Sequence, residues 1–186
     1  MNDLTSKIAL VTGGGTGVGR ATSLQLARRG FDIAINYSRS QDDAEQTASD
    51  VRELGRRSIV VKCDVSSDEQ AVSMIDTVRS EFGRLDVVVN NAGMTYFVDH
   101  TDLDAMSEDK WDRILAVNLK GAFFVSRAAI PLIRESGEGA IVNVASVAGI
   151  AGSGSSIAYA ASKGGLITMT KSLAKAFAPE IRVNVV

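Results

Sequence analysis

The feature that most constrains the fold is a regular alternation of short apolar runs with longer amphipathic segments. Runs such as Val87–Val89 and Ala140–Val144 are apolar at almost every position, which is typical of strands that are covered on both faces. The segments between such runs have the length and spacing of amphipathic helices. This order of elements favours a parallel sheet with helices on each side.

We expect six strands and five helices. The predicted strands are Lys7–Val11, Asp32–Tyr37, Ser58–Lys62, Leu85–Val89, Ala140–Val144 and Ile181–Val186. The predicted helices are Arg20–Arg29 (closed by Gly30), Asp42–Leu54, Ser67–Phe82, Ser107–Ile133 and Ser156–Phe177, and the Gly/Ser-rich stretch 149–156 is expected to be a loop. An open, doubly wound α/β sheet is the leading topology, because a closed eight-fold barrel needs more repeats than six strands provide.

Composition excludes several classes of protein. The 186 residues suit a single domain, 1–186, and 20 Lys and Arg against 22 Asp and Glu give a net charge of −2. This balance gives no long-range electrostatic reason to expect nucleic acid or a membrane as a partner. Cys63 and His100, the single residues of their kinds, cannot supply a disulfide or the usual zinc site, so no metal is predicted. The apolar runs are too short to span a membrane and the start has no signal-peptide core, so we expect a cytoplasmic protein.

A glycine cluster lies between the first predicted strand and the first predicted helix. Backbone amides at such a turn can approach a pyrophosphate, and the helix dipole favours its negative charge. The spacing is G-x-x-x-G-x-G, and a plain glycine-rich turn is the alternative interpretation. The candidate pyrophosphate-binding residues are Gly13, Gly15, Thr16, Gly17, Val18 and Gly19.

The end of the second predicted strand bears on the choice of cofactor. In dinucleotide sites an acidic residue there binds the ribose 2′-hydroxyl. Here the strand ends at Tyr37, and no acid occurs before Asp42. Ser38 and Arg39 could meet a 2′-phosphate instead, which favours NADP(H) and leaves NAD(H) as the alternative. Arg39 could also be a solvated loop residue.

Polar residues follow the third and fourth predicted strands. Asp64 and Val65 come after the third, and Asn91, Ala92 and Gly93 after the fourth. Both segments fall at carboxyl ends of strands, where open α/β sheets bind ligands. Asparagines after strands are also ordinary turn formers, so each segment alone has a structural alternative.

The most specific chemistry lies in the last predicted helix. Tyr159 and Lys163 are four residues apart, so their side chains share one face. A nearby ammonium lowers the pKa of a phenol and makes it a better acid–base at neutral pH. Ser146, after the fifth strand, could hydrogen-bond the same substrate oxygen. A surface pair on a helix is the alternative for Tyr159 and Lys163.

Together these residues resemble the classical short-chain dehydrogenase/reductases, and in particular the members that are similar to 3-oxoacyl-carrier-protein reductases. The resemblance extends from about Ser6 to Val186. Its motifs are Thr12-Gly13-x-x-x-Gly17-x-Gly19, Asp64, Asn90-Asn91-Ala92-Gly93, Asn118, Ser146 and Tyr159-x-x-x-Lys163, with INYSRS at 35–40, VNLKGAFFVSRA at 117–128 and YAASKGGLITMTKSLA at 159–174.

The resemblance implies a Rossmann fold and hydride exchange between a nicotinamide and a carbonyl or secondary alcohol. Tyr159 would be the acid in reduction and the base in oxidation, with Ser146 orienting the substrate oxygen. Lys163 would bind the nicotinamide ribose and lower the pKa of the tyrosine, and Asn118 would hold a water that links the lysine to solvent. A buried asparagine satisfied by backbone groups is the alternative for Asn118.

The resemblance also implies how the cofactor is bound. The glycine turn would take the pyrophosphate and Asp64, next to Val65, the adenine edge. Asn91, Ala92 and Gly93 would contact the adenosine side, while Asn90 braces the sheet. A small-molecule carbonyl or alcohol, which could be a 3-oxoacyl thioester, is the expected substrate. A homo-oligomer, a tetramer or a dimer, is the expected assembly.

The sequence departs from the family at its C-terminal end. Family members continue with a turn at the nicotinamide, a substrate-covering segment and a seventh strand, and this chain stops at Val186. We therefore expect the C-terminal part to be missing. A protein that binds the cofactor without catalysis is the alternative function.

Overall fold

The computed structural model describes residues 7–186, so the first six residues of the predicted domain lie outside the described range. Within residues 7–186 the strands are β1 (Ile8–Val11), β2 (Asp32–Tyr37), β3 (Ser58–Lys62), β4 (Val87–Asn90), β5 (Gly139–Asn143) and β6 (Ile181–Val185). The helices are α1 (Gly17–Arg28), α2 (Gln41–Glu53), α3 (Asp68–Phe82), α4 (Glu108–Leu115), α5 (Ala122–Glu135), α6 (Ala148–Ala151) and α7 (Ile157–Phe177), with a π-helical stretch, η1 (Ala116–Gly121), between α4 and α5.

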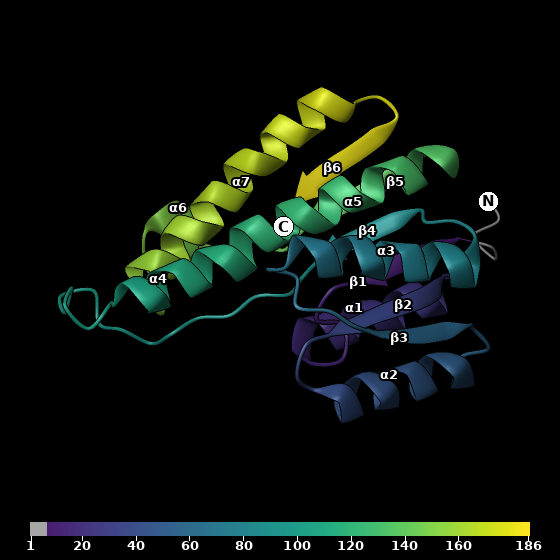
Figure 1. Cartoon of the computed structure of the whole chain (residues 1–186), viewed down its shortest axis with the longest axis horizontal. Coiled ribbons are helices and arrows are strands. Elements are labelled where there is room, and N and C mark those ends of the chain that lie inside the picture. The colour runs from purple at the N-terminus through teal and green to yellow at the C-terminus, as the bar shows by residue number, and fades with distance from the viewer. Residues whose placement is uncertain (1–6) are drawn as a thin grey trace.

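The strands form one parallel sheet in the order β3-β2-β1-β4-β5-β6. The chain moves outward from β1 to β3, returns to the centre at β4 and then moves outward on the other side (Figure 1). This is the predicted doubly wound sheet. The reversal between β1 and β4 creates the crevice in which such sheets bind ligands.

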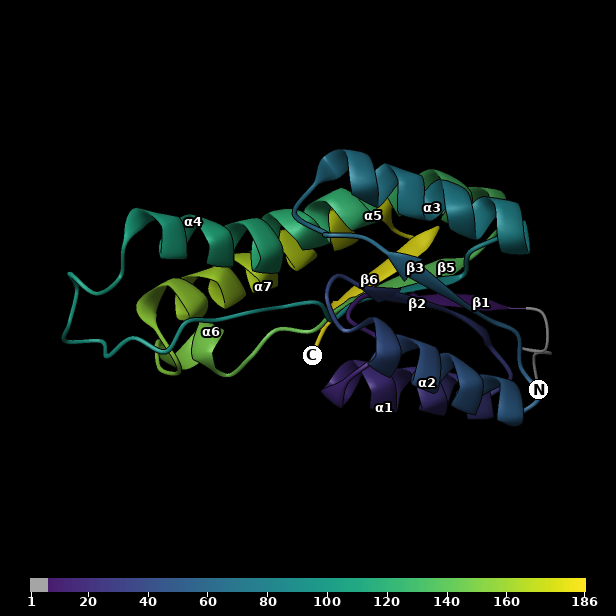
Figure 2. The ribbon, with the colours of Figure 1, turned by 60° about the horizontal axis from the view of Figure 1, so that its bottom comes forward.

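The apolar strands supply two separate cores because successive side chains point to opposite faces of the sheet. In β1, Ala9 and Val11 pack with residues of α1 and α2. Ile8 and Leu10 face the other core, to which α3, α5 and α7 contribute. Figure 2 shows α1 and α2 on one side of the sheet and α3, α5 and α7 on the other. Continuous apolar runs are therefore what this arrangement requires.

One expectation about local structure was wrong in part. The stretch 149–156 was expected to be a loop, but its start belongs to the short helix α6. This helix packs so closely on α7 that a Cβ on Gly149 would lie 2.6 Å from the backbone nitrogen of Gly164. The predicted helix Ser107–Ile133 is confirmed as one continuous helical segment, Glu108–Glu135, whose middle part, η1, is π-helical.

The continuous helical segment Glu108–Glu135 is long and apolar enough to cross a membrane by length and composition alone. In the folded chain its Ile114, Val125, Leu132 and Ile133 are buried. Packing in the protein core accounts for its apolar composition.

Candidate functional site

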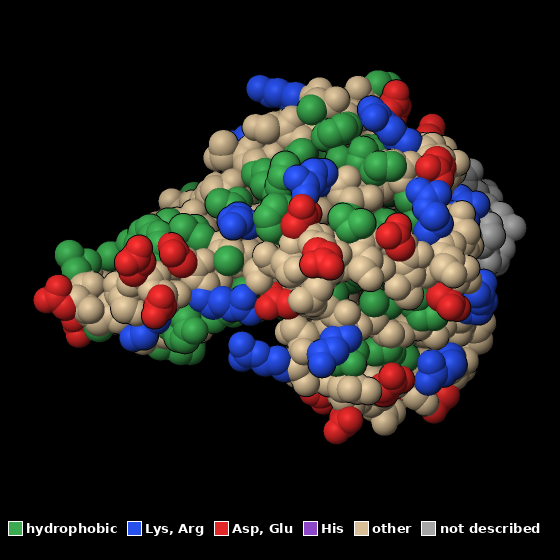
Figure 3. Space-filling view, in the orientation of Figure 1, with side chains coloured by type: hydrophobic (Ala, Val, Ile, Leu, Met, Phe, Trp, Pro, Cys, Tyr) green, Lys and Arg blue, Asp and Glu red, His purple; other side chains and the backbone are tan. Residues whose placement is uncertain are grey.

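A cleft of about 280 Å³ opens at the carboxyl ends of β1 to β4. Figure 3 shows the corresponding hollow between the arm that carries α4 and the lobe that carries α2. Of the predicted cofactor-binding residues, those that line the cleft are Gly13, Gly15, Thr16, Tyr37, Ser38, Arg39, Asp64, Val65, Ala92 and Gly93. Those that do not line it are Gly17, Val18, Gly19, Asn91, Tyr159 and Lys163.

The glycine turn brings backbone rather than side chains to the cleft. Gly13 has a φ of +60°, a conformation that other residues rarely adopt. A Cβ on Gly19 would lie 2.1 Å from the carbonyl oxygen of Gly13, so only glycine fits where α1 crosses the turn. Thr16 is the N-cap of α1, and the positive end of this helix therefore faces the cleft.

Asn91 supports this turn from outside the cleft. Its Nδ2 donates to the carbonyl oxygens of Thr12 and Gly13 at 2.9 and 3.2 Å. Thr12 Oγ1 in turn accepts from the backbone N–H groups of Asn91 and Ala92, both at 3.0 Å. The side chain of Asn91 therefore fixes the glycine turn against the segment after β4.

Asn90 braces the sheet, as the resemblance implied. Its Nδ2 lies 2.8 Å from Oδ1 of Asn143 on β5 and 3.0 Å from Oγ of Ser126 on α5. Asn143 Nδ2 donates to Thr170 Oγ1 on α7 at 2.8 Å. This buried polar chain fixes β4 and β5 to the helices that cover them.

The end of β2 places one cation beside the cleft. Arg39 is exposed, lines the cleft and makes no ion pair within residues 7–186. Asn36, which the sequence analysis missed, also lines the cleft, and its Oδ1 accepts from the backbone N–H of Gly13 at 3.2 Å. Asn36 thus connects the end of β2 to the glycine turn.

Asp64 and Arg113 form an ion pair in the wall of the cleft. Arg113 Nη2 donates to Asp64 Oδ2 at 2.8 Å, and both residues line the cleft. Burial by itself would raise the pKa of Asp64, but hydrogen bonds from Ser66 and Arg113 outweigh it and lower the pKa. Asp64 is therefore ionised at neutral pH. Arg113 was missed because its partner lies 49 residues away in the sequence.

Cys63 lies next to this ion pair and also lines the cleft. Burial, together with the charge of Asp64, raises the pKa of its thiol to about 11. The thiolate is the nucleophilic form of cysteine. Cys63 is therefore a wall residue at neutral pH and not a nucleophile.

Tyr159 and Lys163 share one face of α7, as predicted. The Lys163 Nζ lies 5.8 Å from the centroid of the Tyr159 ring and donates to the carbonyl oxygen of Val144 at 2.7 Å. Lys163 is only 4% exposed, and this burial lowers the pKa of its amine to about 8. The pair is held at the carboxyl end of β5.

Ser146 reaches the same end of β5. Its Oγ accepts from the backbone N–H of Ala148 at 3.1 Å, which caps the entry to α6. Because Gly149 in α6 is pressed against Gly164 in α7, the Ser146 turn is anchored on the helix that carries the tyrosine and lysine. The structure therefore gathers all three residues in one region.

Asn118 is buried in η1 and bonded to protein groups. Its Oδ1 accepts from the backbone N–H of Met94 at 2.8 Å, and its Nδ2 donates to Met94 O at 2.9 Å and to Ser162 Oγ at 3.1 Å. These bonds match the alternative given for Asn118, a buried amide satisfied largely by backbone. A Cβ on Gly93 would lie 3.4 Å from Asn118 Oδ1 and 3.6 Å from Lys163 Nζ, so this cluster connects the cleft to the amine.

Comparisons with known proteins agree with this geometry. The family model described as short chain dehydrogenase matches residues 7–186. The 3-oxoacyl-[acyl-carrier-protein] reductase FabG of Staphylococcus aureus is 40% identical over 182 residues, which cover 97% of this chain and 73% of that protein.

Solved structures agree as well. A crystal structure from Burkholderia xenovorans, assigned to the short-chain dehydrogenase/reductases, matches with a TM-score of 0.95 and 38% identity over 97% of this chain and 76% of the other. NAD⁺-bound xylitol dehydrogenase matches with a TM-score of 0.92 and 36% identity over 99% of this chain and 70% of that one. These relatives are therefore longer than the 186 residues here.

Proposed function

The chain belongs to the short-chain dehydrogenase family, and from this premise we propose that it is an NADP(H)-dependent oxidoreductase. The proposed reaction is reversible hydride transfer between the nicotinamide and a carbonyl or secondary alcohol, with a 3-oxoacyl thioester as the first substrate to test. The observation that carries the proposal is the buried amine of Lys163 beside the Tyr159 ring, near the cleft.

The residues present fit a dinucleotide. Gly13 and Gly15 bring backbone to the wall of the cleft, and the turn is kept tight because Gly19 packs on Gly13 O with no room for a Cβ. Backbone N–H groups in such a turn can approach a pyrophosphate closely. The cleft continues past the ends of β2 and β3, which gives room for a ribose and a base. Cofactor-binding roles for Gly13, Gly15 and Thr16 follow from this arrangement.

The chemistry of the proposed reaction is divided among three side chains. When bound, the nicotinamide supplies or accepts the hydride at the carbonyl carbon. In reduction, Tyr159 donates its phenolic proton to the substrate oxygen, and in oxidation the phenolate takes that proton back. Ser146 donates a hydrogen bond to the same oxygen and holds it near the tyrosine.

Lys163 stabilises the phenolate that remains after proton donation, because an ammonium near a phenolate favours its charged form. The amine is held in place by Val144 O. A proton relay from Lys163 to solvent through a water near Asn118 belongs to this proposal. The hydrogen bonds of the Asn118 side chain to Met94 and Ser162 would hold Asn118 in place for this relay.

Arg39 supports the choice of NADP(H) over NAD(H). It is an exposed cation on the cleft wall, and Ser38 lies beside it. A 2′-phosphate would gain hydrogen bonds with good geometry from a guanidinium and a hydroxyl. Tyr37, the residue before them, also lines the cleft and would contact the ribose side.

Oxidation of NADPH, followed by its absorbance with a panel of ketones and a 3-oxobutanoyl thioester, tests the proposal. We expect turnover that Tyr159→Phe reduces by about a hundredfold or more, since general acid catalysis contributes roughly 10²–10⁴-fold. Arg39→Ala is expected to remove the preference for NADPH over NADH while leaving thermal unfolding unchanged. Binding without turnover of any carbonyl would instead favour the non-catalytic alternative.

We propose that the protein acts on a small molecule in the cytoplasm and assembles with copies of itself. Phe123 on α5 and Ile157 on α7 are apolar and exposed, as the contact residues of a self-associating surface would be, since large exposed apolar patches mark interaction sites. Light scattering of the purified chain distinguishes a monomer from a dimer or tetramer.

A further inference from the structure

We propose that Arg113 is a positioning residue that orients the Asp64 carboxylate and thereby selects adenine as the base of the bound cofactor. This inference rests on the proposed function, because it concerns the base end of the same cleft. Both side chains line that cleft. They come from α4 and from the turn after β3, so their contact closes one wall of the cleft with two separate parts of the fold.

The carboxylate of Asp64 is nearly saturated with donors. Its Oδ1 accepts from the backbone N–H and the hydroxyl of Ser66 at 3.0 and 2.7 Å. Its Oδ2 accepts from Arg113 at 2.8 Å. A carboxylate has about four acceptor positions. Within residues 7–186 these bonds therefore leave one position, on Oδ2, for a ligand in the cleft.

Arg113 fixes orientation as well as charge. Its second terminal nitrogen, Nη1, donates to the Ser66 hydroxyl at 2.8 Å, so Arg113, Ser66 and Asp64 form a closed ring of hydrogen bonds. The rigid fork of the guanidinium is what makes two such bonds compatible. A lysine, with one terminal nitrogen, cannot reproduce this ring in the same geometry.

The backbone of Asp64 is held independently of Arg113. Its N–H donates to Gln70 Oε1 at 2.9 Å, and its carbonyl accepts from the N–H of Ser67 at 2.9 Å. Ser67 is the N-cap of α3, and its hydroxyl accepts from the N–H of Gln70. Removal of the Arg113 guanidinium is therefore expected to free Oδ2 of the carboxylate, while Ser66 still holds Oδ1 and the turn keeps its place.

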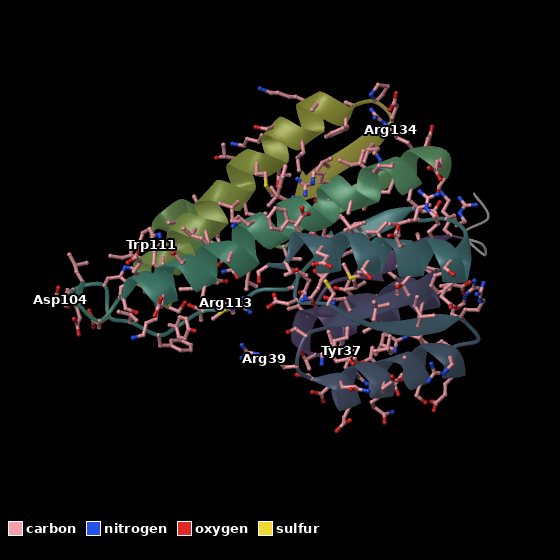
Figure 4. The ribbon with its side chains drawn as sticks, viewed as in Figure 1. Tyr37, Arg39, Asp104, Trp111, Arg113 and Arg134 are labelled. Carbon is pink, nitrogen blue, oxygen red and sulfur yellow. The ribbon has the colours of Figure 1, made fainter. Side chains whose placement is uncertain are left out.

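The order of the strands assigns this end of the cleft to the base. The glycine turn follows β1, Arg39 follows the neighbouring β2, and Asp64 follows β3 at the edge of the sheet. A dinucleotide with its pyrophosphate at the glycine turn places a ribose near Arg39 and the base near Asp64. In Figure 4, Arg39 and Arg113 approach the cleft from the α2 lobe and from α4.

The free acceptor position on Asp64 Oδ2 can distinguish one purine base from another, because it pairs only with a hydrogen-bond donor. Adenine offers an amino donor at its six position, whereas hypoxanthine has a carbonyl oxygen there. That oxygen would face a carboxylate lone pair and leave it unpaired. The Arg113 charge also offsets that of Asp64, which otherwise would stand in the same cleft as the cofactor phosphates and repel them.

The test compares the equilibrium binding of NADPH with that of reduced nicotinamide hypoxanthine dinucleotide phosphate, measured by calorimetry. We expect the wild-type protein to prefer the adenine form by about tenfold or more, the size of a lost hydrogen bond to a charged acceptor. In Arg113→Met the preference falls to about threefold or less, mainly through weaker binding of NADPH. Arg113→Lys is expected to retain an intermediate preference.

Arg127→Met is the matched control. Arg127 makes an ion pair with Asp68 on α3 and does not line the cleft, so its loss is expected to leave base preference at the wild-type value. Thermal unfolding without ligand checks that each variant is folded. If Arg113→Met does not fold, the test rests on Arg113→Lys, whose preference for the adenine dinucleotide is expected to be lower than that of the wild-type protein.

Three results would overturn the inference. One is equal binding of the two dinucleotides by the wild-type protein, and another is an unchanged preference in the folded Arg113 variants. A third is an equal loss of affinity for both ligands in those variants, which would show that Arg113 only supports the fold. All three leave the proposed function standing, whereas a wild-type protein that binds neither dinucleotide removes both proposals.

Discussion

Replacement of Lys163 by methionine is expected to abolish one component of the pH dependence of folding stability. Burial lowers the pKa of this amine from 10.5 to about 8. Between these values the unfolded chain holds the proton and the folded chain has released it, so stability rises with pH. At about 1.4 kcal/mol per pKa unit, the rise is about 3 kcal/mol and is complete above the pKa of the unfolded state.

Urea unfolding, followed by circular dichroism at several pH values from about 7 to 10.5, measures this effect. The quantity of interest is the free energy of unfolding of the wild-type protein minus that of Lys163→Met. This difference is expected to be flat below about pH 8 and then to rise. Cys63, with its pKa raised to about 11, makes stability fall with pH in both proteins and cancels in the difference.

Lys171→Met serves as the control, because Lys171 is exposed on the same helix. Its difference from the wild-type protein is expected to show no rise over the same pH range. A flat difference for Lys163→Met would refute the reasoning. It would mean that the amine is solvated or paired in solution, and that its burial beside Tyr159 does not shift its pKa.

Two further substitutions test the supports of the site. Gly19→Ala would place a Cβ 2.1 Å from Gly13 O and is expected to abolish NADPH binding in a calorimetric titration. Gly55→Ala is the control, because Gly55 has a positive φ and open space around it. This control is expected to cost only about 1 kcal/mol of folding stability and to leave NADPH binding intact. Asn118→Leu leaves both backbone groups of Met94 without their partner and is expected to cost about 2–3 kcal/mol in urea unfolding; a cost below about 0.5 kcal/mol would show that this anchor is unimportant.

The strands and most helices could be predicted because their signals are local. Continuous apolar runs gave the strands Asp32–Tyr37 and Ser58–Lys62 with the same bounds as in the structure. Gly30 was predicted to close the first helix. In the structure it follows the end of α1 and has a φ of +96°. Such features depend on a few neighbouring residues, and the sequence displays them directly.

The features that were missed depend on contacts between distant segments. The helix α6 is set by close packing of Gly149 on α7, and no local pattern distinguishes it from a loop. The π-helical stretch around Asn118 likewise has no local signature. In the sequence, Arg113 looks like an ordinary charged residue on a surface helix, because its partner Asp64 is close only in the folded chain.

The sequence predicted which residues gather at the candidate site, but not every contact that their side chains make. Tyr159 and Lys163 were paired by helical spacing, and the structure places them together. Asn91 was expected to contact the adenosine side of the cofactor, and this stays a prediction. Its side chain has a further role that the sequence did not indicate, since it holds the backbone of Thr12 and Gly13.

The most direct test of the account follows the hydride itself. The protein is supplied with NADPH that carries deuterium at the transferring position of the nicotinamide and with a 3-oxobutanoyl thioester, and the product is examined by mass spectrometry. The account predicts one deuterium on the carbinol carbon of the alcohol, and a rate of labelling that falls about a hundredfold or more in Tyr159→Phe. Unlabelled product, or labelling at an unchanged rate without the phenol, would contradict it.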